Sequence, residues 1–113
     1  MDKKQKKILD SNRFERCGTV AEMLKSDEWD GVRVIYAITD PQDSRVVYIG
    51  DTETGRNLRA RLKAHMAHRA KAGLVEEDSR VYVHFMVTEY KVLTDFEEAT
   101  GALPELNKRK VQK

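Results

Sequence analysis

The sequence predicts one α+β (α/β) domain built on a small three-stranded antiparallel sheet flanked by helices. Three segments rich in β-branched and aromatic residues predict the strands, at residues 32–38, 45–50 and 80–87. The turn formers of residues 39–44 join the first two strands into a hairpin. A chain of 113 residues is long enough to bury a hydrophobic core without disulfides.

The first thirty residues look different from the rest. Residues 2–16 are basic and only weakly periodic, so we expect a short helix or a mobile arm there. Thr19 and Glu22 have the spacing of a capping box, which predicts a second short helix. Residues 1–30 are therefore expected to form a basic arm with a short helix, and residues 31–113 the main part of the domain.

Two more helices are predicted after the hairpin. The longer one should run from about residue 55 to residue 72, where Gly73 would end it. Thr94 and Glu97 repeat the capping-box spacing, which predicts a short helix that starts there and ends before Pro104. Helices before and after the strands would cover the sheet.

The composition excludes several classes of protein. Hydrophobic residues make up 40% and charged residues 35%, which is typical of a globular chain with a charged surface. Cys17 is the only cysteine, so no intramolecular disulfide or cysteine-based zinc cluster can form. No apolar run has the length of a membrane span or the form of a signal peptide, so we expect a cytoplasmic protein.

The longer predicted helix carries an unusual run of positive charge. Between Arg56 and Lys71 there are six Lys or Arg residues and no acidic residue. Most charge runs are solvated faces, but an acid-free run beside a strand end also suits a polyanion. We therefore predict nucleic-acid contacts at Arg56, Arg59 and Lys63, and at Gly50, which allows a close backbone approach.

Helical spacing divides this helix into faces. Leu58, Leu62 and Met66 form an apolar stripe, and Arg61 and His65 lie beside it one turn apart. Arg61 could thus be held by packing while its guanidinium grips a phosphate with two hydrogen bonds. The alternative is a surface arginine whose aliphatic stem covers the core.

The hairpin strands contribute two tyrosines. Tyr36 and Tyr48 are separated by eleven residues, and Gly50 follows Tyr48 at the end of its strand. Strand tyrosines are more often half-buried fillers than catalytic groups, and the same holds for His84 in the third predicted strand. The tyrosines acquire a functional meaning only together with the basic helix.

Four segments in a fixed order carry a family resemblance. They are Val34–Tyr36, Tyr48–Gly50, Asn57–His65 and Pro104–Asn107. In order and spacing they resemble the core of the GIY-YIG nucleases, and most of all the small phage endonucleases of that family. The resemblance covers about two thirds of the chain, roughly residues 31–110.

The resemblance implies a metal-dependent endonuclease that hydrolyses phosphodiester bonds in DNA. Tyr36 would be the general base, with His65 or Tyr48 assisting it by hydrogen bonding. Arg61 would stabilise the charge on the scissile phosphate, and Asn107 would support the architecture of the active site. The sequence does not distinguish DNA from RNA.

The family also implies one Mg²⁺ or Mn²⁺ ion held by a glutamate of the last helix. Glu97 and Glu98 are equal candidates, although they lie about one helical turn closer to Asn107 than is usual. The first tripeptide has Val34 in place of glycine, and Asp51 adds an acidic group after the second motif.

The chain has room for the catalytic module and little else. Specificity would then be low, or would come from the N-terminal basic arm, the loops, self-association or a partner protein. The alternative is a catalytically inactive protein of the same fold, which binds nucleic acid or acts in protein interaction or regulation because the last helix has lost the metal.

Overall fold

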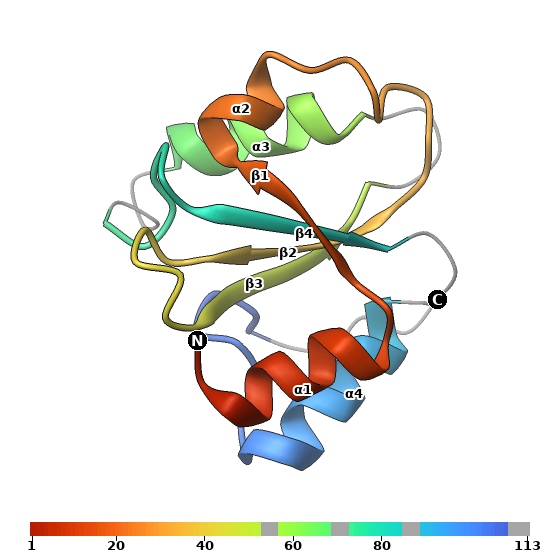
Figure 1. The fold of residues 1–113 in the computed structure, drawn as a ribbon, viewed down its shortest axis with the longest axis vertical. Helices are drawn as coiled ribbons and strands as arrows, with labels where there is room; N and C mark the ends of the chain where they lie inside the picture. Colours follow the sequence, from red (N-terminus) through yellow and green to blue (C-terminus); the bar gives the residue numbers. More distant parts are fainter. Residues whose placement is uncertain (53–56, 69–72, 85–88, 109–113) are drawn as a thin grey trace.

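A computed structural model describes residues 1–52, 57–68, 73–84 and 89–108 of the chain. Within them the protein is an α+β domain with a four-stranded antiparallel sheet between two layers of helices (Figure 1). In chain order the elements are α1 Lys3–Ser11, β1 Glu15–Thr19, α2 Val20–Leu24, β2 Ile35–Thr39, β3 Val46–Asp51, α3 Leu58–Ala67, β4 Arg80–His84 and α4 Glu89–Thr100.

The sheet has the strand order β1-β4-β2-β3, and every neighbouring pair is antiparallel. The prediction of three strands is therefore wrong by one strand, because β1 was assigned to the basic arm. The segment Glu15–Thr19 has no apolar alternation, and its bulge between Arg16 and Gly18 hides the period further. Its extended form comes from pairing with β4 at the sheet edge, which local sequence does not report.

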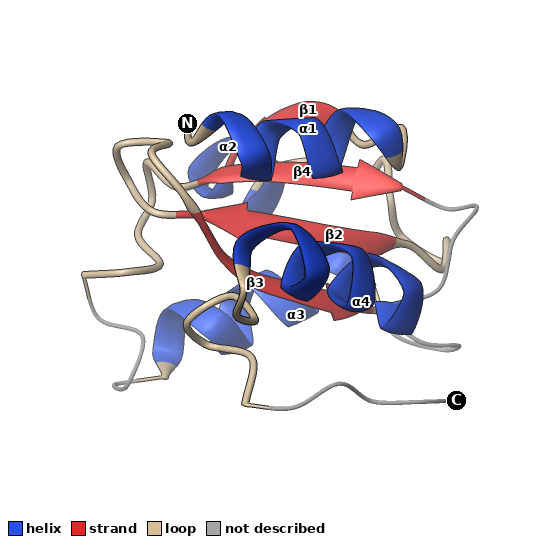
Figure 2. Ribbon diagram, turned by 90° about the horizontal axis from the view of Figure 1, so that it is seen from below, coloured by secondary structure: helices blue, strands red, loops and turns tan. Residues whose placement is uncertain are grey.

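The helices cover the sheet in pairs. Helices α2 and α3 lie on one face, and α1 and α4 lie on the other (Figures 1 and 2). Each face has its own hydrophobic cluster, one containing residues of α2 and α3 and the other containing residues of α1 and α4. No helix in the described ranges is long and apolar enough to cross a membrane.

The two faces are separated by the alternation of side chains along β2. Tyr36 and Ile38 belong to the cluster on the α3 face, and Ile35 and Ala37 belong to the cluster on the α4 face. All five residues of this strand are buried, as expected of a central strand covered on both faces.

The N-terminal segment is part of the same core. Of the two predicted alternatives, a short helix or a mobile arm, the structure shows the helix. Asp2 caps α1 by accepting from the amides of Lys4 and Gln5. Ile8 and Leu9 are buried against α4, so residues of the basic segment help to hold the layer beneath the sheet.

The two predicted capping boxes have different outcomes. The first is confirmed, since Thr19 and Glu22 exchange both hydrogen bonds at the start of α2. The second is wrong, because α4 begins at Glu89 and Thr94 lies in its middle. Buried Val92 and Leu93 extend the apolar face of α4 toward its N-terminus, and this packing overrides the local pattern.

Helix α3 is shorter in the structure than the predicted range. It starts after Asn57, whose side chain accepts from the amide of Ala60, and it ends at Ala67. Gly73 has a left-handed φ of 81° but lies beyond the helix end, so it does not cap α3. The remaining parts of the predicted range, 55–56 and 69–72, and the predicted strand residues 85–87 lie outside the described residues.

Candidate functional site

Two tyrosines and one glycine meet on the α3 face of the hairpin. Tyr36 in β2 pairs with Gly50 in β3, and Tyr48 lies two residues before Gly50 on the same face. A Cβ atom added at Gly50 would lie 2.6 Å from Tyr48 Cε2 and 2.8 Å from both Cζ and the hydroxyl of Tyr36. The missing side chain therefore leaves the space in which the two rings lie 5.9 Å apart.

Helix α3 brings a histidine onto this pair. Leu58 and Leu62 are buried in the cluster below, which fixes the rotation of the helix about its axis. His65, one turn after Leu62, is then directed at the sheet. A hydrogen bond of 2.7 Å joins the Tyr36 hydroxyl and His65 Nε2, and the His65 ring lies 4.4 Å from that of Tyr48.

These groups differ in their access to solvent. Tyr36 is 0% exposed and His65 is 4% exposed, so the hydroxyl–imidazole pair is the floor of the site. Tyr48 is only partly buried and packs against the edge of the cluster. A group that removes a proton from water must be reachable from solvent. Tyr48 meets this condition better than Tyr36, which the sequence argument had assigned as the base.

Arg61 is a cation on the same side of α3 as His65. It lies four residues before His65 on α3, so the two side chains leave the same side of the helix. Its side chain is half-buried and its Nε atom is buried, which leaves the guanidinium at the boundary between core and surface. The side-chain stem is thus held by packing, as the helical spacing predicted.

Asn107 does not lie in the cluster but fastens the strand that carries it. Its side-chain amide donates to the carbonyl of Ile49 at 2.8 Å and accepts from the Ile49 amide at 2.9 Å. The amide of Leu106 also donates to the carbonyl of Val47. The C-terminal segment thereby pairs with β3 like a short extra strand, next to Tyr48. Asn107 therefore fixes the C-terminal segment to the strand that carries Tyr48.

Asp51 is committed to an ion pair at the end of β3. Its carboxylate accepts from Nε of Arg33 at 3.2 Å and from a terminal nitrogen of Arg33 at 2.8 Å. The Asp51 side chain is buried and Arg33 is half exposed. This bidentate ion pair offsets the negative charge of Asp51, which the sequence analysis expected near the predicted phosphate-binding site.

The four predicted nucleic-acid contacts have different outcomes. Arg59 is bound to Asp30 through both branches of its guanidinium, one of them at 3.0 Å, and this partner raises the pKa of Arg59. Its charge is thus already balanced. Lys63 is exposed on α3, and Arg56 lies outside the described residues. Gly50 acts on the two tyrosines, as its contacts show.

The two predicted metal ligands lie on the wrong side of the sheet. Glu97 and Glu98 are in the last part of α4, whose buried residues pack on the face opposite to Tyr36. Their neighbours Phe96 and Thr100 line a hollow with Val46, at the start of β3, whereas Gly50 is near its end. In the described part of the chain no group of three or more His, Cys, Asp or Glu side chains could hold a metal. Glu97 and Glu98 therefore do not fit a metal at the tyrosine cluster.

The start of α4 is the part of this region that sequence reasoning missed. The helix begins at Glu89, five residues after β4 ends at His84, whereas the capping-box pattern placed the start at Thr94. The periodicity of Val92, Leu93 and Phe96 was the signal that could have found it.

No family model, no curated protein and no solved structure matches this chain.

Proposed function

We propose that the protein is a phosphodiesterase of the GIY-YIG type that cleaves DNA at the Tyr36, Tyr48 and His65 cluster. The observation that carries the proposal is the hydrogen bond of 2.7 Å between the Tyr36 hydroxyl and His65 Nε2, with Tyr48 packed on the same imidazole. Gly50 lies against the two tyrosine rings, and Arg61 lies one helical turn before His65. A core with a purely structural role does not require this combination of residues.

The proposed division of labour follows from burial. Tyr48 and Arg61, which reach the boundary of the core, contact the substrate, and Tyr36 with His65 hold them from below. Arg61 balances the negative charge that develops on the phosphate when water attacks the phosphorus and the bond to the leaving oxygen breaks. Tyr48 takes the proton of the attacking water.

A tyrosine needs help to act as a base. The ordinary pKa of the phenol is about 10, so a phenolate is rare at neutral pH. A cation near the hydroxyl favours the charged form and lowers that pKa. Arg61, which leaves α3 on the same side as His65, is the residue of the cluster that carries such a charge. The proposal therefore makes Arg61 important for both the substrate and the base.

Metal dependence is a separate part of the proposal. A divalent ion bound near the scissile phosphate would supply Lewis-acid assistance to the leaving oxygen. Glu97 and Glu98 lie on the face of the sheet opposite to Tyr36, so we assign no residue of the described ranges to such a site. The steps assigned to Tyr48 and Arg61 do not depend on the identity of the metal ligands.

The test is a nicking assay on supercoiled plasmid DNA in magnesium buffer, with and without a chelator. Arg61→Ala should lower the cleavage rate by at least about 100-fold. Arg59→Ala is the matched control, because it removes the same charge from the same helix but breaks only the pair with Asp30. Tyr48→Phe should lower the rate more than Tyr36→Phe does.

The outcomes separate the possible functions. Wild-type rates in Arg61→Ala would refute the assignment of the site. Retention of DNA without nicking, with or without magnesium, would instead support the non-catalytic binding protein, which the position of Glu97 and Glu98 favours. Equal rates in Tyr36→Phe and Tyr48→Phe would contradict the division of labour by burial.

A further inference from the structure

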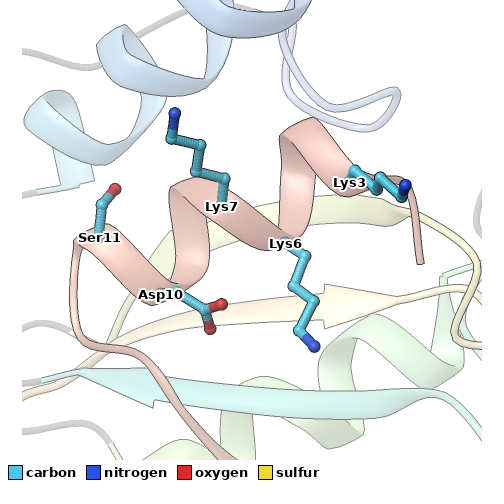
Figure 3. Close-up of a pocket in the computed structure, with 5 residues that line it drawn as sticks. All are labelled: Lys3, Lys6, Lys7, Asp10 and Ser11. Carbon is cyan, nitrogen blue, oxygen red and sulfur yellow. The ribbon is translucent and has the colours of Figure 1, made fainter.

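The exposed side of α1 carries positive charge that the proposed active site does not use. Lys3, Lys4, Lys6 and Lys7 are all exposed. Lys6 projects to one side of the helix together with Asp10, and Lys7 projects to the other side together with Ser11 (Figure 3). Throughout the described ranges, no ion pair is made by any of these lysines. Their charge is therefore available to a ligand.

A hollow of about 350 Å³ opens beside these lysines, between α1 and the strands β1 and β4. Four apolar or aromatic residues line it, Met1, Leu9, Phe14 and Tyr82, of which Leu9 and Phe14 are buried and Tyr82 is partly exposed. Lys6 and Arg16 add positive charge to the wall, and Asp10 and Asp43 add negative charge. The size is within the range of pockets that take small ligands or single residues of a polymer.

The polar groups of the hollow have a defined arrangement. The Tyr82 hydroxyl donates to Asp43 at 3.3 Å, and Asp43 holds a left-handed φ of 54° in the hairpin turn. Burial and the charge of Asp43 raise the pKa of Tyr82, so its ring stays neutral. Asp10 lies at the border with a second, shallower hollow lined by Lys3, Lys6, Lys7 and Ser11. Carboxylates at these positions can accept hydrogen bonds from the N–H groups of a base.

The aromatic side chains of the hollow and the exposed lysines of α1 together indicate one class of ligand. Aromatic side chains beside a row of cations are how proteins bind single-stranded nucleic acid, since the rings stack on bases and the cations follow the backbone. A paired base of a duplex cannot leave its stack to enter a pocket without a further energetic cost. A polyanion without bases would use the lysines but not the aromatic wall.

We propose that the surface formed by α1, β1 and β4 binds single-stranded nucleic acid, with one unpaired base in the hollow at Phe14 and Tyr82 and the neighbouring phosphates on Lys3, Lys6, Lys7 and Arg16. This surface lies on the face of the sheet opposite to the Tyr36–His65 pair. It is a second site, and its existence does not depend on whether the protein cleaves DNA.

The first experiment measures the fluorescence anisotropy of a labelled 12-nucleotide single strand of mixed sequence in low salt. All proteins carry Arg61→Ala, which removes cleavage and the phosphate contact of the proposed active site. Adding Lys6→Gln with Arg16→Gln should raise Kd by at least about tenfold, because two phosphate contacts are lost. The control pair Lys25→Gln with Lys108→Gln removes the same charge from exposed positions elsewhere and should change Kd by less than about twofold.

The second experiment locates the base. A single strand containing 5-iodouracil is photo-crosslinked to the Arg61→Ala protein, and the modified peptide is identified by mass spectrometry. An adduct at Tyr82 or Phe14 is expected. Adducts confined to Trp29 or Tyr48 would overturn the proposal, and so would equal Kd values for the Lys6/Arg16 and Lys25/Lys108 pairs. A 12-base-pair duplex that binds as tightly as the single strand would also overturn it.

The same data distinguish a failure of this proposal from a failure of the proposed nuclease function. Binding that depends on Lys6 and Arg16, in a protein that fails the nicking assay, leaves the second site standing and removes only the enzyme. Nicking that depends on Arg61, together with unchanged binding in the Lys6/Arg16 double variant, supports the enzyme and removes only the second site. Thermal unfolding of each variant checks that the fold is retained.

Discussion

The two faces of the sheet are built from alternate residues of the same strands, yet they differ in kind. On the α3 face the buried layer includes hydrogen-bonding groups, because Tyr36 meets His65 there. On the α4 face the contacts between sheet and helix are apolar, with Ile35, Ala37 and Ile49 against Val92, Leu93 and Phe96. This face also has buried polar residues: Asn12 donates to the carboxylate of Asp95, and His84 packs near the ring of Phe14. The α3 face differs because its buried polar pair joins the sheet directly to a helix beside a second tyrosine, which favours a functional interpretation of that face.

The same comparison of the two faces can be made with two buried histidines, one on each face. His65 and His84 are similarly buried, at 4% and 7% exposure. The imidazole of His65 contacts a tyrosine hydroxyl, whereas that of His84 lies 5.8 Å from the ring of Phe14. Burial and the charge of Arg13 lower the pKa of His84. The two histidines are thus alike in burial and differ in the side chains that they contact.

The largest effect is expected from filling the space under the tyrosines. Gly50→Ala would place a methyl group within 2.8 Å of the Tyr36 hydroxyl, so both rings must move. Overpacking of this kind destabilises a protein by about 1–3 kcal/mol. Displacement of the catalytic groups by about 1 Å lowers rates on the order of 100-fold. The nicking assay and chemical denaturation measure the two effects separately.

Gly101→Ala is the matched control for this change. Gly101 has a left-handed φ of 86°, and a Cβ atom there meets nothing within 4 Å. The substitution should destabilise the protein by about 1–2 kcal/mol through the backbone alone, with little change in activity. If both variants lose activity in proportion to their stability, Gly50 has no special role and the distinction between the faces is weakened.

A smaller effect is expected from the histidine of the α4 face. Because the pKa of His84 is lowered in the folded protein, the unfolded chain binds the proton more readily. The stabilising contribution is present above the ordinary pKa of about 6.5 and is lost as the pH falls through the folded value. Denaturation between pH 7.5 and pH 5 should show a steeper loss in the wild type than in His84→Gln.

The difference in slope cannot exceed that of one proton, about 1.4 kcal/mol per pH unit. The nicking rate of His84→Gln at pH 7.5 should match that of the wild type, since His84 lies on the face away from the tyrosines. A large loss of activity in this variant, without a loss of stability, would mean that the two faces are not functionally separate.

The smallest effect is expected from Glu97 and Glu98, the two acidic residues that the sequence analysis predicted as metal ligands. Glu97→Gln combined with Glu98→Gln should leave the nicking rate and its magnesium dependence within about twofold of the wild type. Abolished cleavage in the double variant, with the fold intact, would support Glu97 or Glu98 as a metal ligand. It would also contradict the functional separation of the two faces of the sheet.

Much of the arrangement could be predicted because it depends on local spacing. The helical repeat of Leu58, Leu62 and Met66 predicts which way α3 turns, and with it the positions of Arg61 and His65. The strand alternation around Tyr48 and Gly50 predicts that they share a face. By contrast, local capping signals gave the wrong start for α4, because a Thr-x-x-Glu pattern also occurs inside helices where apolar packing continues upstream.

Local patterns in the sequence were enough to predict the α+β class, the hairpin with its two tyrosines, and the basic helix that follows it. These depend on residues within a few positions of each other, so periodicity and turn chemistry report them. Three other features follow from tertiary contacts: β1 joins the sheet, Asp30 balances the charge of Arg59, and α4 lies on the face opposite to Tyr36. Each of these depends on contacts between residues far apart in the chain, whose free energy no local pattern contains.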